Sequence, residues 1–213
     1  MTLVLTTYDW VPEFPRGHVR DIRIRWLLEE LGQPYQITTV PLRDKTDAHL
    51  AQQPFHQVPF IRDGDLVLFE SGAILLHLAE GTDLMPEDKA PQVRQWLIAA
   101  LNSIETFSMA WILAKIFDRD EAGAARREPL LRQRLSQLQE ALDGGDWLTG
   151  DRFTVADILM ADILRIPAQN GLLDDLPGLA AYLERATARP AFQKALTDQM
   201  AHWQAADAKE VAE

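Results

Sequence analysis

Residues 57–74 read Gln-Val-Pro-Phe-Ile-Arg-Asp-Gly-Asp-Leu-Val-Leu-Phe-Glu-Ser-Gly-Ala-Ile, and they carry the most specific structural signals in the chain. Two short apolar runs, 58–61 and 66–69, flank Arg-Asp-Gly-Asp at 62–65, which is a typical β-hairpin turn. Residues 71–79 then have the apolar composition of a packed helix. The stretch therefore predicts a β-hairpin followed by a helix.

Alternating strand and helix signals precede this stretch. The pattern predicts strands at 3–8 and 35–40, a helix at 18–31 that ends at Gly32 and Pro34, and a weak helix near 45–52. The predicted order is β-α-β-α-β-β-α, a small α/β domain at residues 1–83.

No strand signal follows Leu84. The segment 84–91, with Pro86 and Pro91 around a short polar run, is predicted to be a linker, and 92–213 an all-helical domain. Its apolar positions step by three and four from Val93 to Ala114, as in a long helix over 92–117. Further helices are predicted at 127–142, 154–166, 176–187 and 190–206.

Composition excludes several classes of function. The chain has 213 residues, a formal net charge of −11 and no Cys. The charge argues against binding nucleic acid or an anionic membrane, and the absence of Cys excludes a cysteine nucleophile. The first residues do not read as a secretory leader, and the longest apolar run, near 109–117, is judged too short to cross a bilayer. We therefore expect a soluble cytoplasmic protein.

Two motifs in the opening stretch carry chemistry. Pro59 after Val58 has two readings: an edge-strand proline with the usual trans bond, or a cis bond that turns the Val58 main chain outward toward a peptide. Glu70 and Ser71 stand where a strand gives way to a helix, so Ser71 is expected to cap the helix. The pair suits an α-amino-acid group, which carries one charge of each sign, although a plain cap beside a solvated Glu is the alternative.

Together the two motifs resemble the glutathione-binding half of the cytosolic glutathione S-transferase family. Residues 24–35, Ile-Arg-Trp-Leu-Leu-Glu-Glu-Leu-Gly-Gln-Pro-Tyr, are similar to that family's first helix, and 150–157, Gly-Asp-Arg-Phe-Thr-Val-Ala-Asp, to its capping box. The resemblance covers nearly the whole chain. It implies a thioredoxin-like first domain, an all-α second domain and a homodimer.

The resemblance also assigns roles to residues. Val58, followed by a cis Pro59, would pair through its main chain with the cysteinyl unit of glutathione. Glu70 and Ser71 would hold the γ-glutamyl end, Gln57 would lie beside the peptide, and Arg43 would meet the glycyl carboxylate. Thr154 and Asp157 would serve the fold alone.

The family stabilises the glutathione thiolate with a Tyr, Ser or Cys. This chain has no Cys and no Ser before Ser71, so Tyr8 is the candidate, with Thr6 and Thr7 as weaker ones. An electrostatic alternative is a cluster of basic residues, which is either an anion site or a solvated helix face. Its members are Arg16, His18, Arg20, Arg23 and Arg25.

Aromatic and apolar residues suggest a pocket for an electrophile, or else plain core. The candidates are Trp10, Phe14, Met109, Trp111 and Ile112, with His202 and Trp203 near the same region.

The predicted function is transfer of the glutathione thiolate to a small apolar electrophile. Thiol-dependent cleavage or isomerisation would use the same thiolate. The alternative is a catalytically silent binding or regulatory relative. The five histidines show no metal-ligand spacing, so no metal is expected.

Overall fold

The computed structural model describes residues 2–142 and 144–210, which fall into two compact units. The first unit combines the described residues up to 78 with those from 189 onward, and the second is 79–188. Helix α9 (Pro190–Glu210) therefore belongs to the first unit, whereas its sequence was assigned to the helical domain at 92–213. The domain boundaries at 83 and 92 stay a proposal.

A four-stranded mixed sheet in the order β2-β1-β3-β4 forms the centre of the first unit. Its strands are β1 (Leu3–Tyr8), β2 (Tyr35–Val40), β3 (Phe60–Asp63) and β4 (Leu66–Phe69). Strand β1 runs parallel to β2 and antiparallel to β3, and β3 and β4 form the predicted hairpin. Gly64 takes φ of 61° in its two-residue turn, where a left-handed residue is needed. Strand β3 begins two residues later than expected, because Val58 and Pro59 take no part in the ladder.

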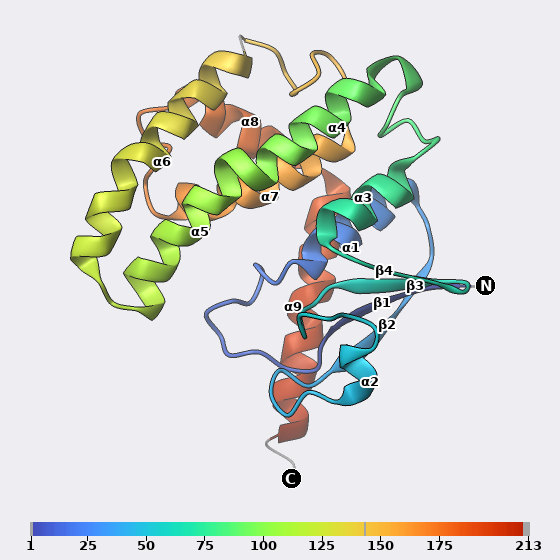
Figure 1. The fold of residues 1–213 in the computed structure, drawn as a ribbon. Coiled ribbons are helices and arrows are strands. Elements are labelled where there is room, and N and C mark those ends of the chain that lie inside the picture. The colour runs from blue at the N-terminus through green and yellow to red at the C-terminus, as the bar shows by residue number, and fades with distance from the viewer. Residues whose placement is uncertain (1, 143, 211–213) are drawn as a thin grey trace. The chain divides into compact units, whose positions relative to one another are not determined.

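Three helices pack around this sheet. They are α1 (Asp21–Leu31), α2 (Asp47–Leu50) and α3 (Ser71–Ala79), and Figure 1 shows α1 and α3 on one side of the sheet with α2 on the other. Helix α1 ends as predicted at Gly32, whose φ of 60° allows its N–H to reach the Glu29 carbonyl. It begins at residue 21 rather than 18, because the preceding residues form turns.

Helix α9 packs along α1, as Figure 1 shows. The rings of Trp26 and Phe192 lie 4.7 Å apart. At the same interface Arg189 donates two hydrogen bonds to the Glu30 carboxylate, at 2.6 and 2.7 Å. The last helix of the chain therefore covers the first.

The second unit is helical, with α4 (Ala90–Ala99), α5 (Thr106–Ile112), α6 (Glu121–Leu142), α7 (Val155–Gln169) and α8 (Pro177–Thr187). The long helix predicted at 92–117 is present, but π-helical segments at Ala100–Glu105 and Leu113–Phe117 interrupt it. Helix α6 begins six residues before the expected start at 127. The predicted capping box of α7 is confirmed: the Asp157 carboxylate accepts the Thr154 N–H at 2.8 Å. The predicted fold class, a thioredoxin-like α/β part followed by an all-α part, is confirmed.

The helical run Glu87–Phe117 is long and apolar enough, by length and composition, to cross a membrane. On that criterion the expectation that no run is long enough is wrong, because the apolar stretch extends well before Met109. The evidence for a membrane span is weak, since core helices of soluble proteins pass the same test and 44% of the run's most apolar window is buried.

Candidate functional site

Two buried side chains shape the loop that leads into Val58. The Gln53 amide oxygen accepts the N–H groups of Phe55 and Gln57 at 2.6 and 3.2 Å. The His49 ring, which stacks on Phe60, donates from Nε2 to the Gln57 carbonyl at 3.0 Å. Both polar groups of the Gln57 main chain are therefore fixed from inside the fold.

Val58, directly after this fixed residue, leaves its main chain free. The Val58–Pro59 bond is cis. Within the described residues, neither the N–H nor the C=O of half-buried Val58 forms a hydrogen bond. Buried main-chain polar groups are nearly always paired, so a free donor and acceptor at one residue suit an added peptide strand.

Glu70 and Ser71 lie at the start of α3. Glu70 is exposed, with φ of 68°, and its carbonyl accepts the Ile74 N–H at 2.9 Å. Ser71 is therefore the first residue of the helix, so the expectation that it is the cap is wrong. Its buried hydroxyl instead accepts a hydrogen bond from Arg23 Nη1 at 3.1 Å, which places a guanidinium beside the helix N-terminus. Both groups favour a bound carboxylate.

Tyr8 ends β1 next to a cation that the sequence analysis did not select. Lys45 Nζ lies 3.5 Å from the Tyr8 hydroxyl oxygen and 5.3 Å from its ring centroid, and it also donates to the His56 carbonyl. The antiparallel pairing of β1 with β3 ends at the pair Thr6 and Phe60. Tyr8 lies two residues after Thr6, and Val58 lies two residues before Phe60. Thr6 and Thr7 are buried in the sheet.

The basic cluster is neither a single anion site nor a solvated face. Arg25 is buried and donates to Asp21 at 2.7 Å, and burial raises the pKa of the Asp21 carboxyl. Arg23 turns to Ser71, as described above. Arg16 binds Asp207 of α9, and that hydrogen bond lowers the pKa of Asp207 to about 2. The cluster therefore separates into individual contacts.

The remaining predicted residues are spread over both units. Arg43 and Gln57 are exposed, and Phe14 is 52% exposed on the loop after β1. In the second unit, Met109 is half-buried, whereas Trp111 and Ile112 are buried. His202 Nε2 donates to the Tyr8 carbonyl at 3.0 Å, and Trp203 is buried.

Sequence reasoning missed the roles of Lys45 and Arg23. The sequence pattern marks Arg23 only as one member of a basic cluster. It stands on the buried face of α1, four residues from Leu27, where a buried charge needs a partner. Lys45 lies in an irregular loop after β2, and no local pattern connects it to Tyr8.

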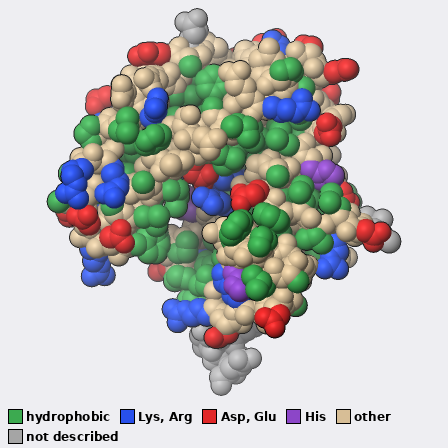
Figure 2. Space-filling view, in the orientation of Figure 1, with side chains coloured by type: hydrophobic (Ala, Val, Ile, Leu, Met, Phe, Trp, Pro, Cys, Tyr) green, Lys and Arg blue, Asp and Glu red, His purple; other side chains and the backbone are tan. Residues whose placement is uncertain are grey.

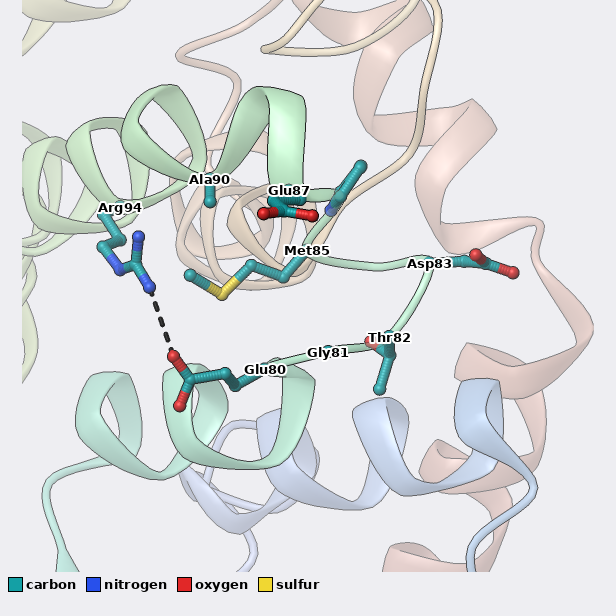
Figure 3. Close-up of a pocket in the computed structure, with 9 residues that line it drawn as sticks. Glu80, Gly81, Thr82, Asp83, Met85, Glu87, Ala90 and Arg94 are labelled. Atoms are coloured by element: carbon teal, nitrogen blue, oxygen red, sulfur yellow. Dashed lines mark hydrogen bonds and ion pairs between the residues drawn. The ribbon is translucent and has the colours of Figure 1, made fainter.

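A separate hollow of about 480 Å³ lies at the connection to α4, wholly in the second unit. Figure 3 shows Glu80 and Arg94 facing each other across it, with Nη2 and Oε1 3.4 Å apart. Met85 and Ala90 form part of its lining, and it contains none of the predicted site residues. Nothing in its lining points to a ligand.

The charged side chains show no dominant patch on the face drawn in Figure 2, where acidic and basic groups are interspersed. Within residues 2–142 and 144–210, no group of three or more His, Asp or Glu is arranged to hold a metal ion.

Comparison with known proteins identifies the family. Residues 4–80 match the model for the glutathione S-transferase N-terminal domain, and residues 101–190 that for the C-terminal domain. Glutathione S-transferase 3 of Zea mays is 33% identical over 195 residues, with 81% of this chain and 86% of that protein covered. Glutathione S-transferase P of Bos taurus is 30% identical over 175 residues, with coverage of 78% and 81%.

A solved structure agrees with these matches. The glutathione transferase of Burkholderia graminis, crystallised with two glutathione molecules bound per subunit, superposes with a TM-score of 0.77 at 25% identity, covering 92% of this chain and 87% of that one. Both family models match in chain order, and together they account for most of the sequence. This chain therefore belongs to the glutathione S-transferase family.

Proposed function

We propose that the first unit binds glutathione and that the protein adds its thiolate to a small apolar electrophile. The observation that carries the proposal is the unpaired main chain of Val58, directly after Gln57, whose own main chain is held by Gln53 and His49. The cysteinyl unit of glutathione pairs with Val58, beside Pro59, and Gln57 lies along the peptide.

The two ends of the tripeptide bind to charged groups. Glu70 pairs with the γ-glutamyl ammonium, and the γ-glutamyl carboxylate meets Ser71, whose hydroxyl is held by Arg23. The glycyl carboxylate reaches Arg43, the exposed cation of the loop after β2 that the sequence predicts for it. In these contacts each charged group of the zwitterionic ligand meets a protein group of complementary charge or hydrogen-bonding character at a fixed position.

The thiolate is stabilised beside Tyr8. A free thiol has a pKa near 8.5, so only a few per cent is ionised at neutral pH. The Tyr8 hydroxyl donates to the thiolate while the Lys45 ammonium, 3.5 Å from that hydroxyl, contributes positive charge. Both effects favour the ionised sulfur.

In the first unit, Trp10 and Phe14 of the loop after β1 are proposed to contact the acceptor. Of the candidates on α5 (Thr106–Ile112), Trp111 and Ile112 are buried, and half-buried Met109 stays a sequence prediction. Cleavage and isomerisation of a bound electrophile remain reactions of the same thiolate.

Calorimetry and a rate assay test this function. We expect wild type to bind glutathione with measurable heat and to accelerate its reaction with an aryl halide. Tyr8→Phe should bind glutathione normally but lower kcat by about tenfold or more, because a hydrogen bond to a charged group is lost. An unchanged rate removes Tyr8 from the mechanism. Binding without any rate in wild type identifies a silent relative instead.

The protein is further proposed to be a cytoplasmic homodimer. Phe55 in the first unit is 65% exposed and meets Phe69 edge-on, with ring centroids 6.2 Å apart, so it presents an apolar surface to a second copy. Light scattering should give twice the chain mass for wild type and a lower mass for Phe55→Ser. Leu50→Ser, at a 43% exposed position in the same segment, is the control.

A further inference from the structure

The loop 9–20, between β1 and α1, is hydrogen-bonded to α9 at both of its ends. At its start, His202 Nε2 donates to the carbonyl of Tyr8 at 3.0 Å. At its end, Gln199 Nε2 donates to the carbonyl of Val19 at 3.0 Å and to Asp21 Oδ1 at 2.6 Å. Gln199 and His202 lie three residues apart on α9, so one face of that helix holds both ends.

Between these ends, Asp207 binds two residues of the loop. Arg16 directs Nη1 and Nη2 at the two carboxylate oxygens of Asp207, both at 2.6 Å, and Trp10 Nε1 donates to Oδ1 at 2.9 Å. The Arg16 side chain also donates to the Val11 carbonyl through Nε and Nη2, at 3.1 and 3.0 Å. One guanidinium therefore closes the loop on itself and joins it to α9. We call Trp10, Arg16 and Asp207 the Asp207 cluster.

The cluster supplies order that the loop has little of on its own. The loop has twelve residues without a helix or strand, and its internal main-chain bonds are short turns such as His18 N–H to the Pro15 carbonyl at 2.9 Å. Loops of this length are uncommon in compact domains unless they have a function. Fork-shaped pairing of Arg with a carboxylate fixes orientation as well as distance, so Asp207 determines where Trp10 lies.

We propose that Asp207 is a positioning residue that fixes loop 9–20 through Arg16 and Trp10. Loop 9–20 carries Trp10 and Phe14, the aromatic residues proposed to contact the acceptor, so this inference rests on the proposed function. Val58, Glu70 and Ser71 stand on other segments of the first unit and have no hydrogen bond to this cluster among the described residues. Loss of the cluster should therefore disturb the electrophile and leave glutathione in place.

Steady-state kinetics of Asp207→Asn with glutathione and an aryl halide test the proposal. The amide keeps an oxygen for Trp10 but loses the charge that Arg16 binds. We expect KM for the aryl halide to rise about three- to tenfold, while KM for glutathione stays within about twofold. Asp198→Asn on the same helix, which removes an exposed ion pair with Lys194, is the matched control and should leave both constants unchanged.

Amide hydrogen exchange provides a readout that does not depend on activity. Exchange of residues 10–17 should be at least about tenfold faster in Asp207→Asn than in wild type, and Asp198→Asn should match wild type. Unchanged exchange, or faster exchange with an unchanged KM for the aryl halide, overturns the proposal. Absence of glutathione binding in wild type is a different result, because it removes the proposed function and the positioning role together.

Discussion

Glu70 holds a backbone conformation that is costly for a residue with a side chain. Its φ of 68° is in the left-handed region, where a Cβ crowds the following carbonyl at a cost of about 1–2 kcal/mol. Glycine would take this φ without strain, so the acidic side chain is present at the expense of stability. Strained residues of this kind cluster at binding sites.

Replacing Glu70 with glycine should separate stability from binding. We expect Glu70→Gly to raise the free energy of unfolding by about 0.5–1 kcal/mol and to weaken glutathione binding by about tenfold or more. Urea denaturation and calorimetry measure the two effects. Asp65→Gly, at an exposed position in the β3–β4 turn without the positive φ, is the control for removing a carboxylate. A variant that is both less stable and fully able to bind contradicts this role for Glu70.

Ser71→Ala tests the buried contact behind the same site. The change removes the acceptor that Arg23 Nη1 reaches at 3.1 Å, together with the proposed contact to the γ-glutamyl carboxylate. We expect the Kd for glutathione to rise about tenfold, as for loss of one hydrogen bond to a charged group. Ser136→Ala on α6, where the hydroxyl makes only an exposed 3.5 Å contact with Glu140, should leave the Kd unchanged. Equal Kd values in both variants would count against the role of Ser71.

Among the elements, α7 depends on one buried carboxylate. Asp157 accepts the Leu148 N–H, the Thr154 N–H and hydroxyl, and the Tyr182 hydroxyl, at distances from 2.8 to 3.0 Å. Burial raises the pKa of Asp157, and these donors oppose that shift.

Removing this carboxylate should destabilise the helical unit. We expect Asp157→Ala to lower the free energy of unfolding by about 2–4 kcal/mol, because a helix cap is lost and buried donors are left unpaired. Chemical denaturation followed by circular dichroism measures the loss. Asp151→Ala, exposed on the preceding loop, should change stability by less than about 0.5 kcal/mol. A loss of similar size in both variants would contradict the capping argument.

The contact between α9 and loop 9–20 should depend on pH. The pKa of Asp207 is lowered to about 2 from an ordinary value of 3.8, so its ion pair stabilises the folded state above about pH 4 and is lost as the pH falls toward 2. Wild type and Asp207→Asn should therefore differ in urea midpoint by a constant amount between pH 7 and 5 and converge below about pH 4. A difference that grows on acidification would rule out this assignment of the charge.

Local signals predicted some elements well and others not at all. Some features are formed by residues only a few positions apart, so the sequence is sufficient to predict them. They are the helix end at Gly32, the turn at 62–65 and the Thr154–Asp157 capping box. The π-helical segments share the apolar spacing of an ordinary helix and could not be distinguished from it. Val58, Pro59 and Glu70 were selected through local motifs, whereas Lys45 and the Asp207 cluster depend on contacts between distant segments that no spacing rule reveals.

At the scale of the whole molecule, the first unit is built from both ends of the chain. Asp21 and Arg25 of α1 are almost completely buried, and Gln199 of α9 supplies a hydrogen bond to Asp21 at 2.6 Å. Without α9, this buried ion pair and the ring of Trp26 would lose their cover, at a cost of several kcal/mol.

Truncation tests that dependence. A chain that ends at Ala188 should fail to give a cooperative unfolding transition for the first unit, whereas a chain that ends at Asp207 should keep one. Circular dichroism and tryptophan fluorescence during urea titration measure this. A stable, glutathione-binding truncation at Ala188 would show that α9 is dispensable.

This arrangement also determines when the protein can mature on the ribosome. Domains generally fold in the order in which they are synthesised, but here the sheet is made first and its covering helix last. The second unit (79–188) is synthesised before α9. It can therefore complete its structure before the first unit does. The proposed glutathione site then becomes complete only after α9 has emerged, which is later than the whole of the second unit.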